Sequence, residues 1–347
     1  MKPLTYRKSL KDYSLNLTED EYHALPAWSY STIARYAKEG FSAIATLHEP
    51  FTPTPSMEFG SLFDCLVTDR YNVDNRYVVS DTVPPPAEKN VLDCLSAVTD
   101  KPFDLIPDAT VVRAIETCSY YPKWKYETQL THLAEYKDYY NARISGKKIV
   151  SSADMSDALA MVDSFLGNPY IGSLWNTSST DEEHLYQLKF TAGIKLPDGR
   201  KVSVKCMPDK LVVNHRNKTV QPIDVKTSSA PAYDFAENFV KFRYDIQASL
   251  YTTVLRIVLN AHEEYKDYTV LPYVFCDISR SDKQPVSYVY DPMSEDQIDG
   301  FSFKDYKYKG WRELLCEILD YEETKAVVPK YILTNEANDL ISILNSK

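Results

Sequence analysis

Two aspartates and a lysine in the middle of the chain have the types and spacing of a hydrolytic metal site. Asp209 follows an apolar-alternating run, and 14 residues (210 to 223) separate it from Asp224, enough for a strand, a turn and a second strand. Alternate side chains of an extended strand share a face, so Asp224 and Lys226 are expected to point the same way. Such an acid–acid–lysine set can hold a divalent metal over a phosphodiester and activate a water molecule.

A simpler explanation of Asp224 and Lys226 is a local ion pair on an exposed strand face, which occurs often. Their neighbours Ile223 and Val225 favour a central, apolar strand instead. Burying two charges there without a function would cost on the order of several kcal/mol.

A third element lies about 20 residues after Lys226. Tyr244–Tyr251 has the pattern of a helix start, and Gln247 and Tyr251 are i, i+4 neighbours on one face of it. Taken alone, this pair is explained by packing on a helix surface. Because the helix follows strands that carry two acids and a lysine, Gln247 and Tyr251 become candidates for positioning the groups of that site.

Several other chemistries lack their residues in this sequence. There is no G-x-x-x-x-G-K-[ST], G-x-G-x-x-G, H-E-x-x-H or G-x-S-x-G motif, which argues against P-loop, dinucleotide, zinc-protease and serine-hydrolase sites. No C-x-x-C pair occurs, so zinc and iron–sulfur sites are not expected. The six cysteines are expected to be free thiols (Cys65, Cys94, Cys118, Cys206, Cys276, Cys316).

The net charge of −10 hides an uneven distribution. Between Tyr186 and Arg243 there are eleven Lys and Arg against five acids, so this segment carries +6. A basic strip in an acidic body can attract DNA phosphates to a cleft; the alternative is a lysine-rich sheet edge. Four of its residues are the expected DNA contacts (Lys205, Lys210, Lys241, Arg243).

The chain of 347 residues has the composition of a globular protein, with 44% hydrophobic and 25% charged residues. No apolar run approaches the roughly 18 residues of a membrane span, and the first residues lack a signal-peptide stretch. We therefore expect a cytoplasmic protein, in a bacterium or a phage-infected host cell.

Hydrophobic periodicity predicts two parts. Residues 1–165 are expected to be mostly helical, with helices near 31–48, 57–67, 107–120, 124–144 and 152–165. Residues 166–347 are expected to hold the catalytic core: a strand meander from about Glu182, helices at 233–242 and 245–259, a strand pair at 269–278 and 286–290, and a last helix from Ser294 or later to about Tyr321. The fold class is α/β (α+β), a mixed sheet with helices on both faces, and the two parts are expected to form one compact unit.

The full series of motifs resembles the PD-(D/E)xK nuclease superfamily, and within it the RecE/RecB-like branch of phage-type exonucleases. Gly60–Asp64 is similar to the branch's G-x-x-x-H helix, with Asp64 where histidine is usual. Glu183, or its neighbour Glu182, opens the first strand. Pro208-Asp209, Asp224-Val225-Lys226 and Gln247-x-x-x-Tyr251 follow in the family's order, although Met207 replaces a frequent arginine. The resemblance covers residues 28 to 290 and implies a restriction-endonuclease-like core.

By this resemblance, Asp64, Asp209, Asp224 and the Val225 carbonyl would bind one or two Mg²⁺ or Mn²⁺ ions. Both are hard cations that favour oxygen, so Asp64 is a reasonable replacement for histidine. Glu183 would reach the metal directly or through water. No iron–sulfur cluster is implied, because the cysteine quartet of such members is absent.

The resemblance also assigns roles to the side chains around the metal. Lys226 would orient the attacking water or neutralise the scissile phosphate, and Gln247 and Tyr251 would position Lys226 and the DNA end. The implied activity is a double-strand exonuclease, working 5′→3′ on DNA ends for recombination. A single-strand annealing protein is an implied partner, and a ring-shaped homo-oligomer is found among relatives.

Two alternatives stay open. One is an endonuclease of restriction or repair type with the same core. The other is a degenerate nuclease fold that only binds DNA or a protein, which the replacement at Asp64 favours and the intact acid–acid–lysine set opposes.

Overall fold

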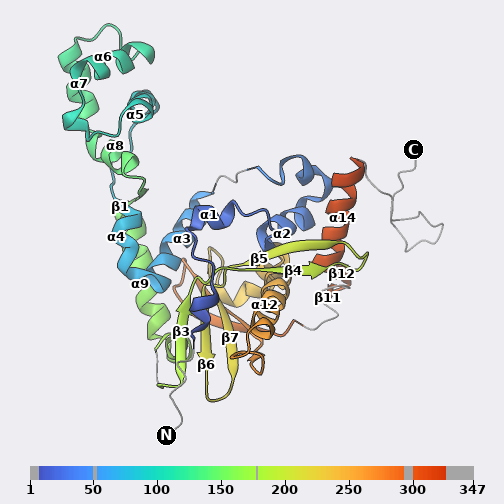
Figure 1. Ribbon diagram of the computed structural model, residues 1–347. Helices are drawn as coiled ribbons and strands as arrows, with labels where there is room; N and C mark the ends of the chain where they lie inside the picture. The colour runs from blue at the N-terminus through green and yellow to red at the C-terminus, as the bar shows by residue number, and fades with distance from the viewer. Residues whose placement is uncertain (1–7, 50–52, 177–178, 293–299, 326–347) are drawn as a thin grey trace. The chain divides into compact units, whose positions relative to one another are not determined.

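The computed structural model describes residues 8–49, 53–176, 179–292 and 300–325 (Figure 1). Contacts between Cα atoms divide the chain into two compact units, which we describe separately. The sheet unit comprises Met1–Thr52 and Phe165–Lys347, and the helical unit comprises Pro53–Ser164. The chain passes from the helical unit back into the sheet unit between residues 164 and 165, and residues 1–52 group with the sheet.

The helical unit consists of short helices and one pair of parallel strands. Its elements are α3 (Pro55–Thr68), α4 (Val73–Arg76), β1 (Tyr77–Val79), α5 (Pro86–Val98), α6 (Asp108–Thr117), α7 (Tyr126–Ala134), α8 (Lys137–Ile144), β2 (Lys148–Val150) and α9 (Ser152–Gly167). The single helix expected over 124–144 is therefore two. The break lies at Glu135 and Tyr136, where Tyr136 leaves helical geometry before α8 begins.

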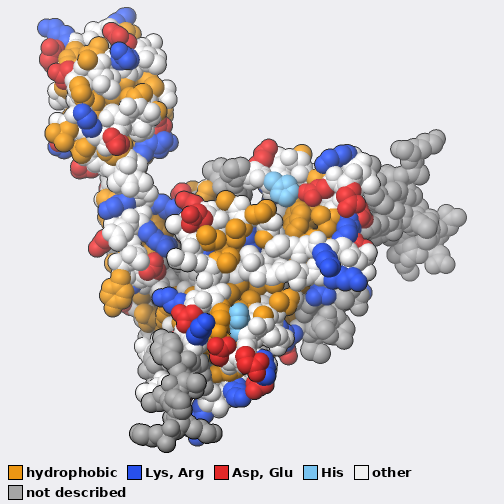
Figure 2. Space-filling model, viewed as in Figure 1, with side chains coloured by type: hydrophobic (Ala, Val, Ile, Leu, Met, Phe, Trp, Pro, Cys, Tyr) orange, Lys and Arg blue, Asp and Glu red, His pale blue; other side chains and the backbone are white. Residues whose placement is uncertain are grey.

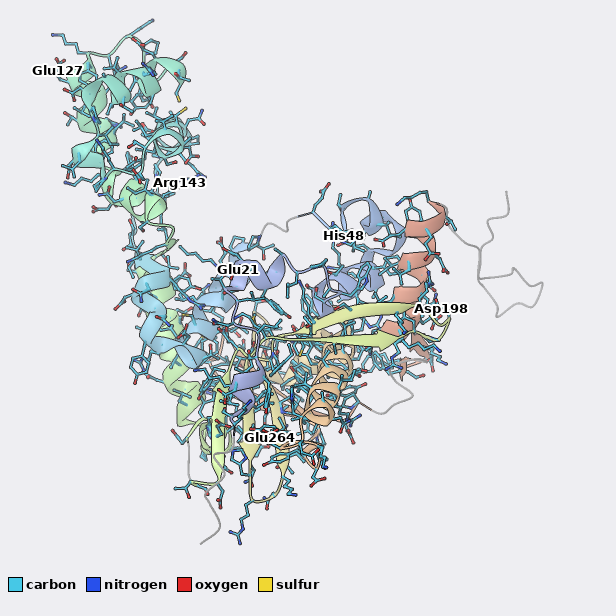
Figure 3. All side chains as sticks on the ribbon, viewed as in Figure 1. Glu21, His48, Glu127, Arg143, Asp198 and Glu264 are labelled. Carbon is cyan, nitrogen blue, oxygen red and sulfur yellow. The ribbon has the colours of Figure 1, made fainter. Side chains whose placement is uncertain are left out.

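A separate hydrophobic core packs α5 to α8 of this unit together. Leu92, Leu95, Leu133 and Tyr140 are completely buried in it. On the outside, Arg143 of α8 forms an ion pair with Asp93 of α5 at 3.1 Å (Figure 3). Removing this apolar surface from water is the main stabilising contribution to such a small unit.

A six-stranded mixed sheet forms the centre of the sheet unit. Its order is β10-β9-β7-β6-β3, with β8 also paired to β7. The strands are β3 (Glu182–Tyr186), β6 (Lys210–Asn214), β7 (Thr219–Ser228), β8 (Thr269–Val270), β9 (Tyr273–Ser279) and β10 (Pro285–Tyr290). β7 runs parallel to β9 and antiparallel to β6, and α12 (Tyr244–Ala261) lies between β7 and β9 in the sequence. The expected mixed α/β architecture is confirmed.

The meander expected after Glu182 is interrupted by a separate hairpin. β4 (Phe190–Lys195) and β5 (Lys201–Cys206) pair with each other as a two-stranded sheet, joined by a turn in which Gly199 has φ 94°. Arg200 beside this turn forms ion pairs with Asp198 and with Asp320 of α14 (Trp311–Thr324), the latter at 2.7 Å. Figure 3 labels Asp198 at this junction of the hairpin with α14.

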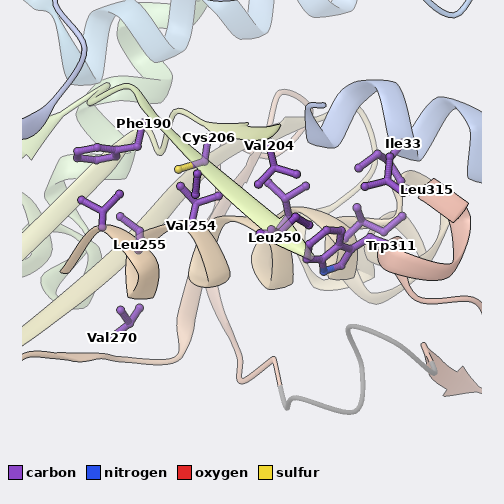
Figure 4. Packing of buried hydrophobic residues seen from close by; sticks show 14 of the residues in the cluster. Ile33, Phe190, Val204, Cys206, Leu250, Val254, Leu255, Val270, Trp311 and Leu315 are labelled. Atoms are coloured by element: carbon purple, nitrogen blue, oxygen red, sulfur yellow. The ribbon is translucent and has the colours of Figure 1, made fainter. Parts of the chain in front are cut away.

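The core of the sheet unit gathers around α12. Its residues Ile246, Leu250, Val254 and Leu255 are completely buried. Figure 4 shows Val254 close to Cys206 of β5, and Leu250 close to Val204 of β5 and Trp311 of α14. α2 (Tyr30–Glu39) packs on both α12 and α14. Its N-cap is Ser29, whose side chain accepts a hydrogen bond from the Thr32 amide.

The C-terminal helix is shorter than expected. Residues 293–299 lie outside the described part of the chain, and residues 301–308 form a two-stranded hairpin, β11 (Phe301–Phe303) and β12 (Tyr306–Tyr308). Aromatic residues at every second position of each strand explain this outcome, because they suit a pleated strand better than a helix.

Candidate active site

The two aspartates expected to form the site lie side by side. β6 and β7 pair with Lys210 opposite Ile223, so the next positions in register are Asp209 and Asp224. Asp209 Oδ2 also accepts a hydrogen bond from the Val225 amide at 2.7 Å, which fixes the carboxylate against β7. The turn before β6 and the middle of β7 therefore bring both acids to one place.

Asp224 is held by side chains from two elements. Its carboxylate is 1% exposed, and Oδ1 accepts from Gln247 Nε2 of α12 at 2.6 Å. Oδ2 lies 2.5 Å from the Lys226 ammonium on the same strand face. The expected link between the Q-x-x-x-Y helix and the D-x-K strand is thus a direct contact, made to Asp224 and not to Lys226.

Lys226 lies in an aromatic setting. Its Nζ is 4.6 Å from the centre of the Tyr244 ring, a cation–π contact. Burial favours a lower pKa for this lysine, but the nearby charge of Asp224 outweighs it and the pKa is raised. Lys226 therefore stays an ammonium at neutral pH, suited to bind or orient an anion and not to accept a proton from water.

The corner between α11 (Phe235–Phe242) and α12 positions these contacts. Arg243 adopts a left-handed conformation there, with φ 56°, and ends α11. Its guanidinium donates to both carboxylate oxygens of buried Asp245, at 2.9 and 3.0 Å, and to the Lys309 carbonyl. This corner sets where α12 begins, and so where Tyr244 and Gln247 meet the strand.

Tyr251 lies one turn beyond Gln247 on α12, near enough to the acids for their charges to act on its hydroxyl. Burial, together with charges that include Asp224 and Asp209, raises its pKa well above the usual value. Its ring packs edge-on against Tyr273, with 6.3 Å between centroids. Tyr251 is therefore a neutral hydroxyl at neutral pH, and its role in positioning a substrate stays a prediction.

Asp277 was not identified from the sequence as a member of this cluster. It lies on β9 opposite Lys226 in parallel register, and it is 1% exposed. Burial raises its pKa to about 7, while the Ser228 hydroxyl, which donates to its Oδ2 at 3.1 Å, and the charge of Lys226 act in the opposite direction. A lone acid in an otherwise apolar run, Tyr273–Ile278, is the signal that could have revealed it.

The donor set fits an oxygen-preferring cation in part. Gln247 Oε1 is a buried acceptor that receives no hydrogen bond from the described residues, whereas Asp224 Oδ2 is paired with the Lys226 ammonium. Mg²⁺ keeps several waters and often uses only one or two protein carboxylates, which Asp209 and Asp224 can supply. Within the described residues, however, no three His, Cys, Asp or Glu side chains form a ready metal-binding group.

The structure places Glu183 away from the two aspartates. Glu183 pairs with Val213 on β6, whereas Gln187 donates its amide to the Asp209 carbonyl. Four residues of extended chain between them correspond to about 13 Å. Glu183 instead accepts from the Ser9 hydroxyl and lies 3.5 Å from His215, while neighbouring Glu182 accepts from Asn214. Neither glutamate joins the cluster.

Three of the four expected DNA contacts are buried and have structural partners. Lys205 is 4% exposed and donates to the carbonyls of Tyr22, His23 and Leu25, at the end of α1 (Glu19–His23). Lys210 is completely buried and donates to the Tyr186 hydroxyl at 2.6 Å. Arg243 holds the α11–α12 corner. These side chains therefore do not reach a phosphate on the surface.

Lys241 is the exception. It is exposed on the last turn of α11, over the ring of Phe242, which is 40% exposed. On the face seen in Figure 2, Lys and Arg side chains are interspersed with acids and do not form a separate basic zone. The excess of positive charge in 186–243 therefore lies partly in the interior.

Asp64 lies in α3, in the helical unit, so the structure does not describe its position relative to Asp209 and Asp224. Its Thr68 neighbour donates to the Asp64 backbone carbonyl, an ordinary helix contact. The assignment of Asp64 as a metal ligand stays a prediction.

Comparison with known proteins assigns no family. No protein-family model matches the chain, and no curated protein does. A solved structure titled "Crystal structure of SSO0001" is 13% identical and covers 76% of this chain and 85% of its own, with a TM-score of 0.27. This likeness is too low to support a statement about fold or function. Separately, no helix in the described part of the chain combines the length and apolar character of a membrane span.

Proposed function

We propose that this protein is a metal-dependent deoxyribonuclease that hydrolyses phosphodiester bonds of linear double-stranded DNA. The observation that carries the proposal is the cluster of Asp209, Asp224, Lys226 and Gln247. It joins two adjacent carboxylates, a permanently charged ammonium and a positioning amide. The same residues resemble the PD-(D/E)xK series in type and order, which agrees with the proposal.

Each side chain has a role that follows from its contacts. Asp209 and Asp224 would hold Mg²⁺ or Mn²⁺, which supplies charge stabilisation and a more acidic bound water. Lys226 remains protonated, so it donates to the scissile phosphate or to the attacking water and balances negative charge. Gln247 keeps the Asp224 carboxylate in one orientation. Tyr251 offers a neutral hydroxyl to the substrate.

The finer proposal is an exonuclease that resects DNA ends 5′→3′ for recombination, beside a single-strand annealing protein and as a ring-shaped oligomer. It rests on the family resemblance. Such a protein would work in the cytoplasm of a bacterium or of a phage-infected host.

The test is a nuclease assay with linear duplex DNA labelled at its 5′ or 3′ ends, in Mg²⁺, Mn²⁺ or EDTA. We expect metal-dependent loss of the label from one end. Asp224→Asn and Lys226→Ala should each lower kcat at least about 100-fold. Asp267→Asn and Lys195→Ala, exposed acid and lysine on the same unit, are the matched controls and should change little.

The outcomes separate the alternatives. Intact linear DNA with either metal would overturn the proposal, as would full activity of both site variants. Cleavage of covalently closed circles would identify an endonuclease. The second candidate is the degenerate binding module, which is favoured because no three His, Cys, Asp or Glu side chains form a metal-binding group among the described residues. Calorimetry with Mn²⁺ tests it. An intact site should release binding heat that the Asp224→Asn variant lacks, whereas a degenerate site should give the same result for both proteins.

A further inference from the structure

The segment between α6 and α7 of the helical unit exposes two stacked aromatic rings. Tyr121 and Trp124 lie with ring centroids 4.3 Å apart and an angle of 18° between their planes. They are 39% and 40% exposed, respectively. Figure 2 shows hydrophobic side chains at the surface of this unit, and Figure 3 labels Glu127 at the start of α7, directly after the segment.

Buried polar groups hold this segment in one conformation. Gln129, 6% exposed, donates its side-chain amide to the carbonyls of Tyr120 and Tyr121 at 2.7 and 3.1 Å. The buried Tyr120 hydroxyl donates to Glu88 at 3.1 Å. Ser119 and Tyr121 both adopt positive φ, 51° and 37°, which costs free energy for residues other than glycine. The core therefore fixes two rings that it does not itself bury.

Within the segment itself the charged side chains are positive, although Glu116 and Glu127 flank it and buried Glu88 lies behind Tyr120 and His132. Lys123 and Lys125 are exposed on either side of Trp124, and residues 118–126 contain no acid. His132 packs edge-on against Trp124, with 5.4 Å between ring centroids. Exposed aromatic rings interleaved with lysines are the surface that single-stranded nucleic acids use, since bases stack on rings and phosphates meet ammonium groups.

We propose that Tyr121, Trp124, Lys123 and Lys125 form a binding site for single-stranded nucleic acid. Bases stack on the fixed aromatic pair, and the lysines contact the flanking phosphates without reading sequence. The site lies wholly in the helical unit and does not depend on the proposed nuclease chemistry. A protein ligand is less well matched, because the rings alternate with charges along the segment.

The experiment titrates the full-length protein with oligothymidylate in EDTA, following tryptophan fluorescence and the anisotropy of a labelled oligonucleotide. We expect quenching on binding. Trp124→Ala and Tyr121→Ala should weaken binding about five- to hundred-fold, whereas Trp124→Phe should retain most of it. Lys123→Ala/Lys125→Ala should weaken binding and reduce the slope of log affinity against log salt by about 1.4.

Tyr71→Ala is the matched control, because Tyr71 belongs to the same unit and is 100% exposed. It should leave the affinity unchanged, and circular dichroism should show that each variant is folded. Equal affinity of wild type, Trp124→Ala and the double lysine variant would overturn the proposal. The proposal would also be overturned if Trp124→Ala changed the sedimentation coefficient of the protein but not its affinity for the oligonucleotide, because the rings would then mediate contact between protein copies. Asp224→Asn should bind normally, so failure here is distinguishable from failure of the nuclease proposal.

Discussion

At the scale of single residues, lysines that look alike in the sequence occupy different environments. Lys226 forms an ion pair with Asp224, and Lys205 caps the end of α1. Lys210 is enclosed by aromatic rings, and Lys241 is exposed. A lysine's contribution to DNA binding depends on whether its ammonium is reachable, which burial decides. Two predictions follow from these environments.

Lys205 and Lys241 should separate stability from DNA binding. Lys205→Met removes the donor from three backbone carbonyls, so the free energy of unfolding should fall by about 1–3 kcal/mol. Lys241→Ala should leave stability unchanged but reduce the slope of log DNA affinity against log salt concentration by the amount expected for roughly one phosphate contact. Urea denaturation and binding titrations at several salt concentrations measure both. Weaker DNA binding by folded Lys205→Met would contradict the assignment.

Lys210 should make stability rise with pH above neutrality. Burial lowers its pKa from 10.5 to about 7 in the folded protein. Between these values the unfolded chain binds more protons, so the free energy of unfolding should rise by roughly 1 kcal/mol per pH unit, and that contribution is lost as pH falls to 7. Urea denaturation between about pH 7 and 9 should show this slope in wild type and not in Lys210→Met.

Two groups that face Lys210 titrate outside this window. Burial lowers the pKa of His184 below its usual 6.5, and burial raises the pKa of Tyr186 above 10.0. Trp175 of α10 (Pro169–Trp175), also against the ammonium, does not titrate. Identical slopes in both proteins would show that Lys210 keeps its proton in the folded state.

At the scale of elements, the α11–α12 corner matters as much as the strand that carries the acids. The strand presents Asp224 and Lys226, but α12 brings the amide and the tyrosine to them. The Arg243–Asp245 pair fixes the angle at which this helix leaves α11. Catalytic geometry would therefore be sensitive to a residue that does not touch the substrate.

Arg243→Ala should destabilise the protein by about 3–5 kcal/mol, because it leaves the buried Asp245 carboxylate unpaired. It should also lower nuclease activity through the displaced start of α12. The double variant Arg243→Ala/Asp245→Ala should recover part of the stability, since no buried charge is left at this corner. Thermal denaturation and the end-labelled assay measure the two effects. Equal stability of the single and double variants would exclude the uncompensated charge as the cause.

At the scale of the whole molecule, two hydrophobic cores stabilise two units. Among the described residues, the core around α12 and the core of α5–α8 have no residue in common. Damage to one is therefore expected to loosen that unit first.

Leu133→Ala tests this separation. Leu133 is completely buried in the helical unit, so the substitution should cost about 2–5 kcal/mol. Hydrogen exchange followed by mass spectrometry should accelerate in α5–α8 and stay unchanged in β6, β7 and α12. Val254→Ala in α12 is the reciprocal control and should show the opposite pattern, because Val254 is completely buried in the sheet unit. Uniform acceleration in either variant would mean that the molecule unfolds as one cooperative unit.

The sequence alone determined the fold class and which residues form the centre of the candidate site. Alternation placed Asp224 and Lys226 on one strand face, and helical periodicity placed Gln247 and Tyr251 one turn apart. Both patterns are local, with periods of about 2 and 3.6 residues, so they can be recognised without knowing how the rest of the chain folds. They predicted the mixed sheet with its helices, which the structure confirms.

Only the tertiary structure decided which charges are reachable and which acids are neighbours. Asp277 meets Lys226 through a strand pairing that spans about fifty residues, and Glu183 leaves the site because of its register with β6. Burial of Lys205, Lys210 and Arg243 likewise depends on segments distant in sequence. Strand register and burial depend on which distant segments pack together as well as on the local pattern, so a single stretch of sequence does not determine them.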